Sequence, residues 1–127
     1  MDIKIIVATH KKYWMPSDDI YLPLHVGKKG KMDLGYQGDD TGDNISEKNA
    51  HYCELTGLYW AWKNLRAEYK GLAHYRRHFM MKGVKGTKEE KVMTKEQLEK
   101  LLLKSDIVLP NPRNYFIETN YNQYVHA

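Results

Sequence analysis

The sequence predicts an α/β fold with a mainly parallel sheet flanked by helices. Three observations lead to this class. Short apolar runs rich in β-branched residues alternate along the chain with segments of helical periodicity. The order strand, helix, strand, helix, strand implies right-handed crossovers between parallel strands. The 127 residues, 42% of them hydrophobic, suit one globular domain with a single core, so we expect one domain over residues 1–127.

The first strand is expected over residues 3–9, where β-branched residues surround a single charge at Lys4. Such a run is typical of a central strand that is covered on both faces. Residues 13–36 contain prolines and glycines without a sustained period, so we expect an irregular segment there. One short strand is expected within it, around residues 21–26.

A helix is expected from about residue 52 to residue 65. Apolar residues recur there at steps of three and four, which predicts an amphipathic helix with one apolar face. The stripe consists of Tyr52, Leu55, Leu58, Tyr59, Trp62 and Leu65. Asn44 with Glu47, or Ser46 alone, is the candidate cap at the start of this helix.

The later elements follow from loop composition and capping. Residues 80–93 are rich in Lys, Gly and Met without an apolar period, which predicts a surface loop. Thr94 and Gln97 form a capping-box pattern that begins a second helix. Residues 106–110 predict another short buried strand, stopped by proline, and residues 118–126 predict the start of a further helix.

A polar cluster follows the short buried strand that residues 69–73 predict. The carboxyl end of a strand is where open α/β sheets hold their ligands, so this position favours a site. If the chain stays extended through residue 78, its side chains alternate between two faces. One face then carries His74, Arg76 and His78, and the other carries Tyr75 and Arg77.

Two neighbouring arginines in this cluster favour a diphosphate ligand. A guanidinium is planar and permanently charged, and it engages two phosphate oxygens at once. Arg76 and Arg77, with His74 as a protonatable donor, are therefore the candidate diphosphate ligands. In the alternative interpretation, one or both arginines pair with Glu54 or Glu68 and only stabilise the sheet.

A second polar turn follows the first strand. Thr9, His10 and Lys11 lie where that strand ends, so they are candidates to contact the base or phosphates of a nucleotide. The alternative is an ordinary solvated loop.

The most acidic stretch, residues 38–47, leaves three interpretations open. Asp39, Asp40 and Asp43 are oxygen donors of the kind that calcium and magnesium prefer, but the stretch lacks EF-hand spacing. Asp and Asn are also common turn and cap residues. In the third interpretation, Asp43 and Asn44 at a helix N-terminus hydrogen-bond a sugar or base.

Composition and motif content limit the classes of ligand and function that the sequence fits. The net charge of +4 favours an anionic ligand, whether nucleotide, nucleic acid or membrane lipid. Cys53 is the single cysteine, which fits a reducing compartment, so a cytoplasmic location is expected. No Walker, Gly-x-Gly-x-x-Gly or Ser-His-Asp pattern is present. His74 and His78 lack a nearby carboxylate that would complete a metal site. Nucleic-acid binding remains the rival class of function, although the RRM consensus is absent.

Three ordered motifs resemble a known bacterial family. They are DDTGDNIS at residues 39–46, YCELTGLYWAWKN at residues 52–64 and GLAHYRR at residues 71–77. Together they are similar to a family of capsular and exopolysaccharide glycosyltransferases, long carried as a domain of unknown function. The resemblance implies a GT-A-like fold whose C-terminal part is missing from this chain. It also implies a nucleoside-diphosphate sugar donor, with UDP and galactofuranose as candidates, and a glycan or lipid-linked acceptor, so that the protein works in the cytoplasm or at the inner face of the membrane.

The resemblance also assigns roles to the candidate residues. Thr9, His10 and Lys11 border the nucleotide, Asp43 and Asn44 contact its base or ribose, and the diphosphate ligands are Arg76, Arg77 and His74. GT-A enzymes commonly hold a divalent ion on an Asp-x-Asp pair, whereas the matching strand here ends in His-Tyr-Arg-Arg. We therefore expect no metal ligands and no cofactor, with Mn²⁺ or Mg²⁺ as the alternative. The rival function is a non-catalytic nucleotide- or nucleic-acid-binding module.

Overall fold

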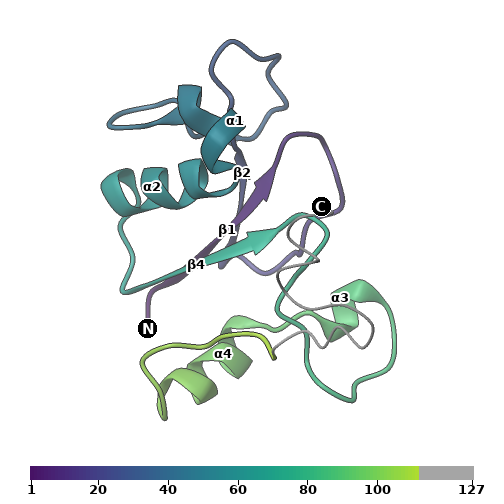
Figure 1. The fold of residues 1–127 in the computed structure, drawn as a ribbon. Helices are drawn as coiled ribbons and strands as arrows, with labels where there is room; N and C mark the ends of the chain where they lie inside the picture. The colour runs from purple at the N-terminus through teal and green to yellow at the C-terminus, as the bar shows by residue number, and fades with distance from the viewer. Residues whose placement is uncertain (112–127) are drawn as a thin grey trace, which may run out of the picture.

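The computed structural model describes residues 1–111 and confirms the predicted α/β class (Figure 1). Four parallel strands form one sheet in the order β3-β2-β1-β4. The strands are β1 (Ile3–Thr9), β2 (Tyr21–His25), β3 (Gln37–Gly38) and β4 (Tyr69–His74). The helices are η1 (Ser46–Lys48), α1 (Asn49–Tyr52), α2 (Leu55–Asn64), α3 (Lys88–Lys91) and α4 (Lys95–Leu102). Sequence reasoning located three of these strands and missed the two-residue β3.

β1 lies at the centre of the sheet because its run of β-branched side chains is buried on both faces. It pairs with β2 on one side and with β4 on the other, so that Ile5 lies between Tyr21 and Gly71. A Cβ added at Gly71 would lie 2.9 Å from Cγ1 of Ile5. The glycine in β4 therefore makes room for the branched side chain of the central strand.

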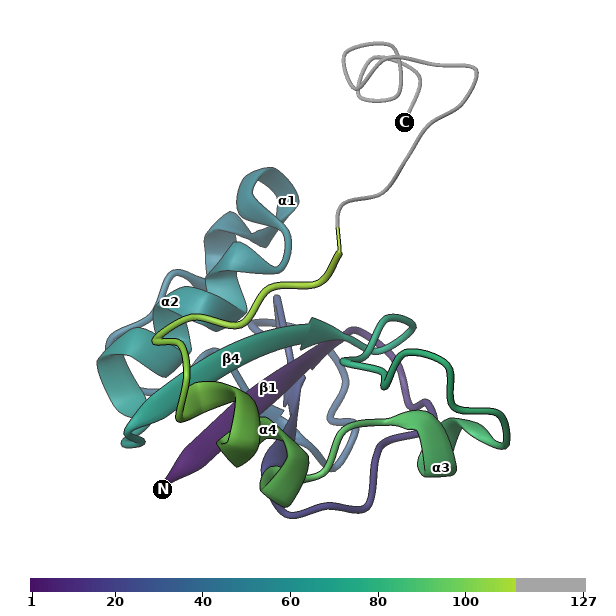
Figure 2. The same ribbon diagram turned by 90° about the horizontal axis from the view of Figure 1, so that it is seen from below.

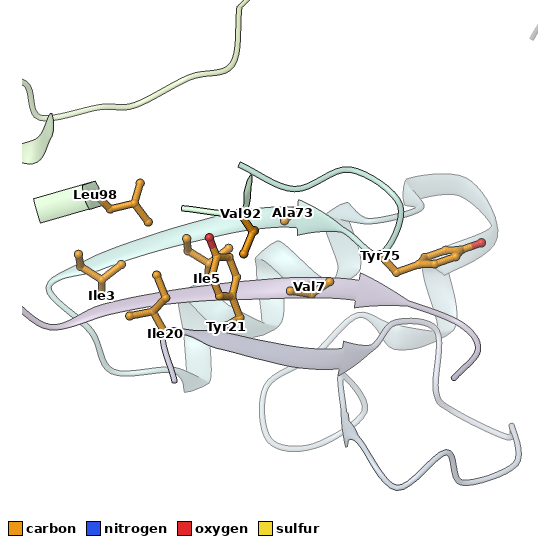
Figure 3. Close-up of a cluster of buried hydrophobic side chains, with 9 residues drawn as sticks. All are labelled: Ile3, Ile5, Val7, Ile20, Tyr21, Ala73, Tyr75, Val92 and Leu98. Atoms are coloured by element: carbon orange, nitrogen blue, oxygen red, sulfur yellow. The ribbon is translucent and has the colours of Figure 1, made fainter. Parts of the chain in front are cut away.

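Helices cover both faces of the sheet, with α2 on one face and α4 on the other (Figure 2). The core is accordingly divided into two clusters by alternate residues of β1. The cluster under α2 contains Ile6, Ala8, Leu24, Val26, Trp60 and Ala61. The opposite cluster contains Ile3, Ile5, Val7, Ile20, Tyr21, Ala73, Tyr75, Val92 and Leu98 (Figure 3).

The buried face of α2 is not the one that the apolar stripe predicts. The helix buries Thr56, Gly57, Trp60 and Ala61, whereas Trp62 of the stripe is 63% exposed. Tyr52, Leu55 and Leu58 are exposed as well. The cause is the close approach of helix and sheet, since a Cβ on Gly57 would lie only 2.8 Å from Cγ1 of Val26. Small residues, rather than the larger aliphatic side chains, allow this approach.

The expected continuous helix is also interrupted near its start. Cys53 separates α1 from α2 with a φ of 51°, a left-handed conformation that costs energy in a non-glycine residue. Ser46 does not cap the helix, because its hydroxyl donates to Asp39 instead. The chain therefore enters α2 through a strained turn that directs Cys53 and Glu54 toward the carboxyl ends of the strands.

The region that was expected to be a plain loop, residues 80–93, is partly ordered. It contains α3, which begins with a capping box at Thr87, and an antiparallel bridge between Met80 and Val92. Val92 is buried in the core because this bridge holds it against the sheet. The capping box at Thr94 is confirmed, with reciprocal bonds to Gln97 at the start of α4.

Residues 106–110 do not form the expected strand. They run as an extended segment without strand pairing and line an apolar cavity of about 320 Å³ beside β4. Ile107 and Leu109 are 73% and 78% exposed, so the segment is not enclosed as a buried strand would be. The expected helix at residues 118–126 lies outside the described residues.

Candidate functional site

The carboxyl ends of β1 and β4 lie at the point where the order in which the chain adds strands to the sheet reverses. From β1 the chain moves outward to β2 and β3, then crosses back to place β4 on the other side of β1. Ligands of open α/β sheets bind at such a point. The loop after Thr9 and the turn after His74 therefore meet, and the Tyr75 amide donates to the Ala8 carbonyl at 3.0 Å.

The chain turns sharply after β4 instead of remaining extended. The Arg77 amide donates to the His74 carbonyl at 2.8 Å, and the His74 amide donates to the Arg77 carbonyl at 3.2 Å. Tyr75 and Arg76 occupy the corner of this turn. The predicted shared face of His74, Arg76 and His78 is therefore wrong, because the reversal places Arg77 with the two histidines around one cavity.

This cavity, the β4 cavity, has a volume of about 490 Å³. Leu55, Leu72 and Phe79 contribute apolar surface, while Glu54, His74, Arg77 and His78 contribute polar groups. A smaller cavity of about 130 Å³, the β1 cavity, lies beside it and includes His10 and Cys53. Glu54 and His74 line both cavities, so the two spaces meet at these side chains.

Both arginines of the turn are exposed. Within residues 1–111, neither Arg76 nor Arg77 forms an ion pair with a carboxylate, so the alternative pairing with Glu54 or Glu68 is not observed. Arg77 lines the β4 cavity, whereas Arg76 lies over the Tyr75 ring with Cζ 5.4 Å from its centroid. Both guanidinium charges are thus available to an anion at this edge.

The predicted nucleotide-binding turn packs against the same ring. His10 and Tyr13 meet Tyr75 edge-on, with centroid distances of 5.6 and 5.1 Å. The Nζ atom of Lys11 lies 5.5 Å from the centroids of both tyrosines. Tyr75 is therefore a buried aromatic platform that the two basic segments share, and its role was not apparent from the sequence.

Thr9 is buried and holds the turn in shape. Its hydroxyl donates to the Lys11 carbonyl and accepts from the Lys11 amide at 3.2 Å. The Thr9 carbonyl accepts from the Val26 amide at 3.0 Å. The side chain of Thr9 therefore stabilises the turn through hydrogen bonds to the Lys11 backbone, while His10 and Lys11 carry the exposed polar groups.

His74 has a defined tautomer. Its Nδ1 accepts from the Arg76 amide at 3.1 Å, so the proton of the neutral ring lies on Nε2, 3.6 Å from Oε1 of Glu54. Burial lowers the pKa of His74, Glu54 opposes this shift, and Arg76 and Arg77 add to the lowering. We therefore expect a neutral His74 at pH 7 that presents an N–H group.

His78 is held by the same turn. Its Nε2 lies 3.1 Å from the Tyr75 carbonyl, and its Nδ1 is buried without a hydrogen-bond partner among the described residues. Burial lowers the pKa of His78, and its ring forms a T-shaped pair with Trp14 at a centroid distance of 5.3 Å. Within residues 1–111, no three His, Cys, Asp or Glu side chains are grouped to hold a metal ion.

Asp39, which the sequence suggests as a possible metal ligand, has a structural role. Its carboxylate is fully buried and accepts four hydrogen bonds. The donors are the amides of Gly27 and Lys28 at 2.8 and 3.0 Å, and the hydroxyls of Ser46 and Thr56 at 2.6 and 2.7 Å. These bonds occupy the oxygens that a cation would need. Asp39 joins the loop after β2 to η1 and α2.

Asp43 and Asn44 lie along the outer side of α2. Asp43 accepts from the Tyr59 hydroxyl at 2.9 Å, and its carbonyl accepts from the Asn64 side chain at 2.9 Å. The side chain of Asn44 bonds to Gly42 and to the Ser46 amide within its own loop. Neither residue lines the β4 or the β1 cavity. Their contact with a base or ribose stays a prediction.

Stability is expected to decrease as the pH falls below neutrality. Burial is the main cause that lowers the pKa of His25, His74 and His78 from the ordinary value of 6.5. The unfolded chain therefore binds protons at a higher pH than the folded chain, and stability is lost from about pH 6.5 down to the folded pKa values. Urea unfolding at about pH 7.5 and about pH 5 will show the midpoint falling.

Two variants separate this effect from general acid denaturation. His25→Gln removes one of the buried rings, so the midpoint should change less with pH than in the unchanged chain. His51→Gln, at an exposed position in α1, should retain the full change. Equal pH dependence in both variants would contradict the assignment of this stability loss to the buried histidine rings.

Comparisons with known proteins agree with the arrangement of the sheet. The family model described as a domain of unknown function (DUF4422) matches residues 4–127. One similar solved structure is the apo form of the WbbM bifunctional glycosyltransferase, with 44% sequence identity and a TM-score of 0.62. The match covers 69% of this chain and 16% of that chain, so this chain spans about a sixth of the relative. No curated protein matches.

In the part of the chain that the structure describes, no helix is long and apolar enough to cross a membrane.

Proposed function

Because the chain belongs to the family described as a domain of unknown function (DUF4422), and a similar structure is a glycosyltransferase, we propose that it transfers a sugar from a nucleoside diphosphate. UDP is the proposed nucleotide. The proposed acceptor is a growing capsular or exopolysaccharide chain or a lipid-linked glycan. The place of action that follows is the cytoplasm, including the inner face of the membrane.

The observation that carries this proposal is the pair of arginines at the end of β4. Their guanidinium groups make no ion pair within residues 1–111, and Arg77 lines a cavity large enough for a sugar phosphate. When a glycosyl bond to a diphosphate breaks, negative charge develops on the leaving oxygen. Fixed cations stabilise that charge more strongly in the transition state than in the bound donor.

The proposed donor lies along the carboxyl edge of the sheet. The nucleotide borders His10 and Lys11, and the diphosphate crosses His74 toward Arg77. His74 supplies an N–H group from its Nε2, and Arg76 approaches from the rim of the turn. Asp43 and Asn44 are proposed to contact the base or ribose, which requires the donor to reach the loop along α2.

Positive side chains are proposed to replace the divalent ion of other GT-A enzymes. The turn after the matching strand carries Arg76 and Arg77, whose positive charges repel a cation and attract phosphate. We therefore expect donor binding and turnover to be unchanged by EDTA. Complete loss of turnover with EDTA, restored by Mn²⁺, would contradict this part of the proposal.

Calorimetric titration of the full chain with UDP tests the function directly. We expect UDP to bind with one site per chain. A parallel titration with a short single-stranded oligonucleotide over a salt series tests the rival class, because polyanion binding weakens steeply as salt rises. Absence of UDP binding together with salt-sensitive oligonucleotide binding would favour a nucleic-acid module instead.

A further inference from the structure

Glu54 is the only carboxylate among the described residues that line the β4 and β1 cavities. It directly precedes α2, whose first residue, Leu55, also lines the β4 cavity. Its side chain is 42% exposed, makes no capping bond and accepts no hydrogen bond from residues 1–111. The negative charge of Glu54 is therefore accessible to a ligand in either cavity.

The nearest basic group does not neutralise this carboxylate. His74 Nε2 lies 3.6 Å from Oε1, which is too long for a strong charge-assisted hydrogen bond. Burial and the two arginines keep the pKa of the His74 ring low, so the ring is neutral near pH 7. Glu54 therefore keeps its lone pairs free beside a neutral ring that carries its proton on Nε2.

The histidines of the β4 cavity are poor proton acceptors by comparison. Nδ1 of His74 is occupied by the Arg76 amide, and its Nε2 carries the proton of the neutral ring. Nε2 of His78 contacts the Tyr75 carbonyl, and its Nδ1 is buried. Within the described part of this cavity, Glu54 is left as the group that combines free lone pairs with access to a reacting hydroxyl.

We propose that Glu54 is the general base of the glycosyl transfer, an inference that rests on the proposed function. In this step the Glu54 carboxylate takes the proton from the acceptor hydroxyl. The acceptor oxygen forms a bond to the anomeric carbon of the donor sugar. The bond between that carbon and the diphosphate oxygen breaks, and its electron pair leaves with the nucleoside diphosphate beside Arg77. Water replaces the acceptor hydroxyl in donor hydrolysis.

The test measures UDP binding and UDP release from UDP-galactofuranose by the full chain, with water as acceptor. Glu54→Gln keeps the size of the side chain but removes the proton acceptor, so the turnover number should fall by about 100-fold or more while UDP affinity is retained. Added formate should restore part of the turnover of Glu54→Ala. Glu47→Gln is the matched control, because Glu47 is exposed and pairs with Lys29 at 3.2 Å away from both cavities.

The outcomes separate this inference from the proposed function. UDP binding with turnover of Glu54→Gln within about threefold of the unchanged chain would overturn the role of Glu54 and leave the transferase function standing. UDP binding without any turnover by the unchanged chain would also overturn it, since this chain would then lack an effective base. No UDP binding by the unchanged chain would overturn both. Retained UDP affinity in each variant also shows that the substitution has not unfolded the site.

Discussion

Replacing Asp39 with alanine is expected to destabilise the fold by about 3 to 5 kcal/mol, enough to unfold much of a typical small domain. The carboxylate of Asp39 is fully buried, and its four donors come from three segments of the chain. Without it, the half-buried amides of Gly27 and Lys28 lose their acceptor and face a void. The hydroxyls of Ser46 and Thr56 lose their partner as well. Urea unfolding followed by circular dichroism measures this loss.

Asp39→Asn and Asp40→Asn complete the experiment. The amide of Asp39→Asn keeps one acceptor oxygen but directs an NH₂ group at two donors, so its stability should lie between those of the unchanged chain and Asp39→Ala. Asp40 is the neighbouring carboxylate and is only half-buried, so Asp40→Asn should change stability by about 0.5 kcal/mol or less. Equal effects at positions 39 and 40 would show that the buried network does not hold the loop to α2.

The parts of the fold that could be predicted from the sequence depend on local patterns. β1 is predicted because burial on both faces demands an unbroken apolar run, and α4 because Thr94 and Gln97 form a capping box. The face of α2 could not be predicted in this way. Its orientation depends on the close contact between Gly57 and Val26, which is a tertiary distance and not a periodicity.

The candidate site also combines features that local sequence patterns predict with features that depend on tertiary contacts. The basic segments at Lys11 and Arg77 could be predicted as neighbours, because strand ends in a parallel sheet share one edge. The turn after His74 could not, since an extended and a reversed chain fit the same polar residues. The sequence alone suggests Glu54 only as a partner for an arginine. Its access to both cavities depends on the strained turn at Cys53, for which the sequence carries no glycine or proline signal.

Arg77→Ala is expected to weaken UDP binding by about 10-fold to 150-fold, the range for losing a hydrogen bond to a charged group. Arg77 lines the β4 cavity without a carboxylate partner in residues 1–111, so its charge is available to a diphosphate. Arg76→Ala should weaken binding less, because that side chain lies over Tyr75 at the rim. The UDP affinity of Arg77→Lys should lie between those of the unchanged chain and Arg77→Ala, since lysine keeps the charge but loses the planar fork.

The control for these arginine variants is a change of charge away from the cavity. Lys85→Ala removes one exposed positive charge from the loop before α3, so it lowers the net charge as much as Arg77→Ala does. If general attraction between a basic protein and an anion dominated, Lys85→Ala and Arg77→Ala would weaken UDP binding equally, and added salt would remove the difference from the unchanged chain. A specific site predicts a difference that persists in salt, because a guanidinium that contacts phosphate in a cavity is poorly screened. Calorimetry at low and high salt with both variants therefore decides whether Arg77 acts through its position or only through its charge.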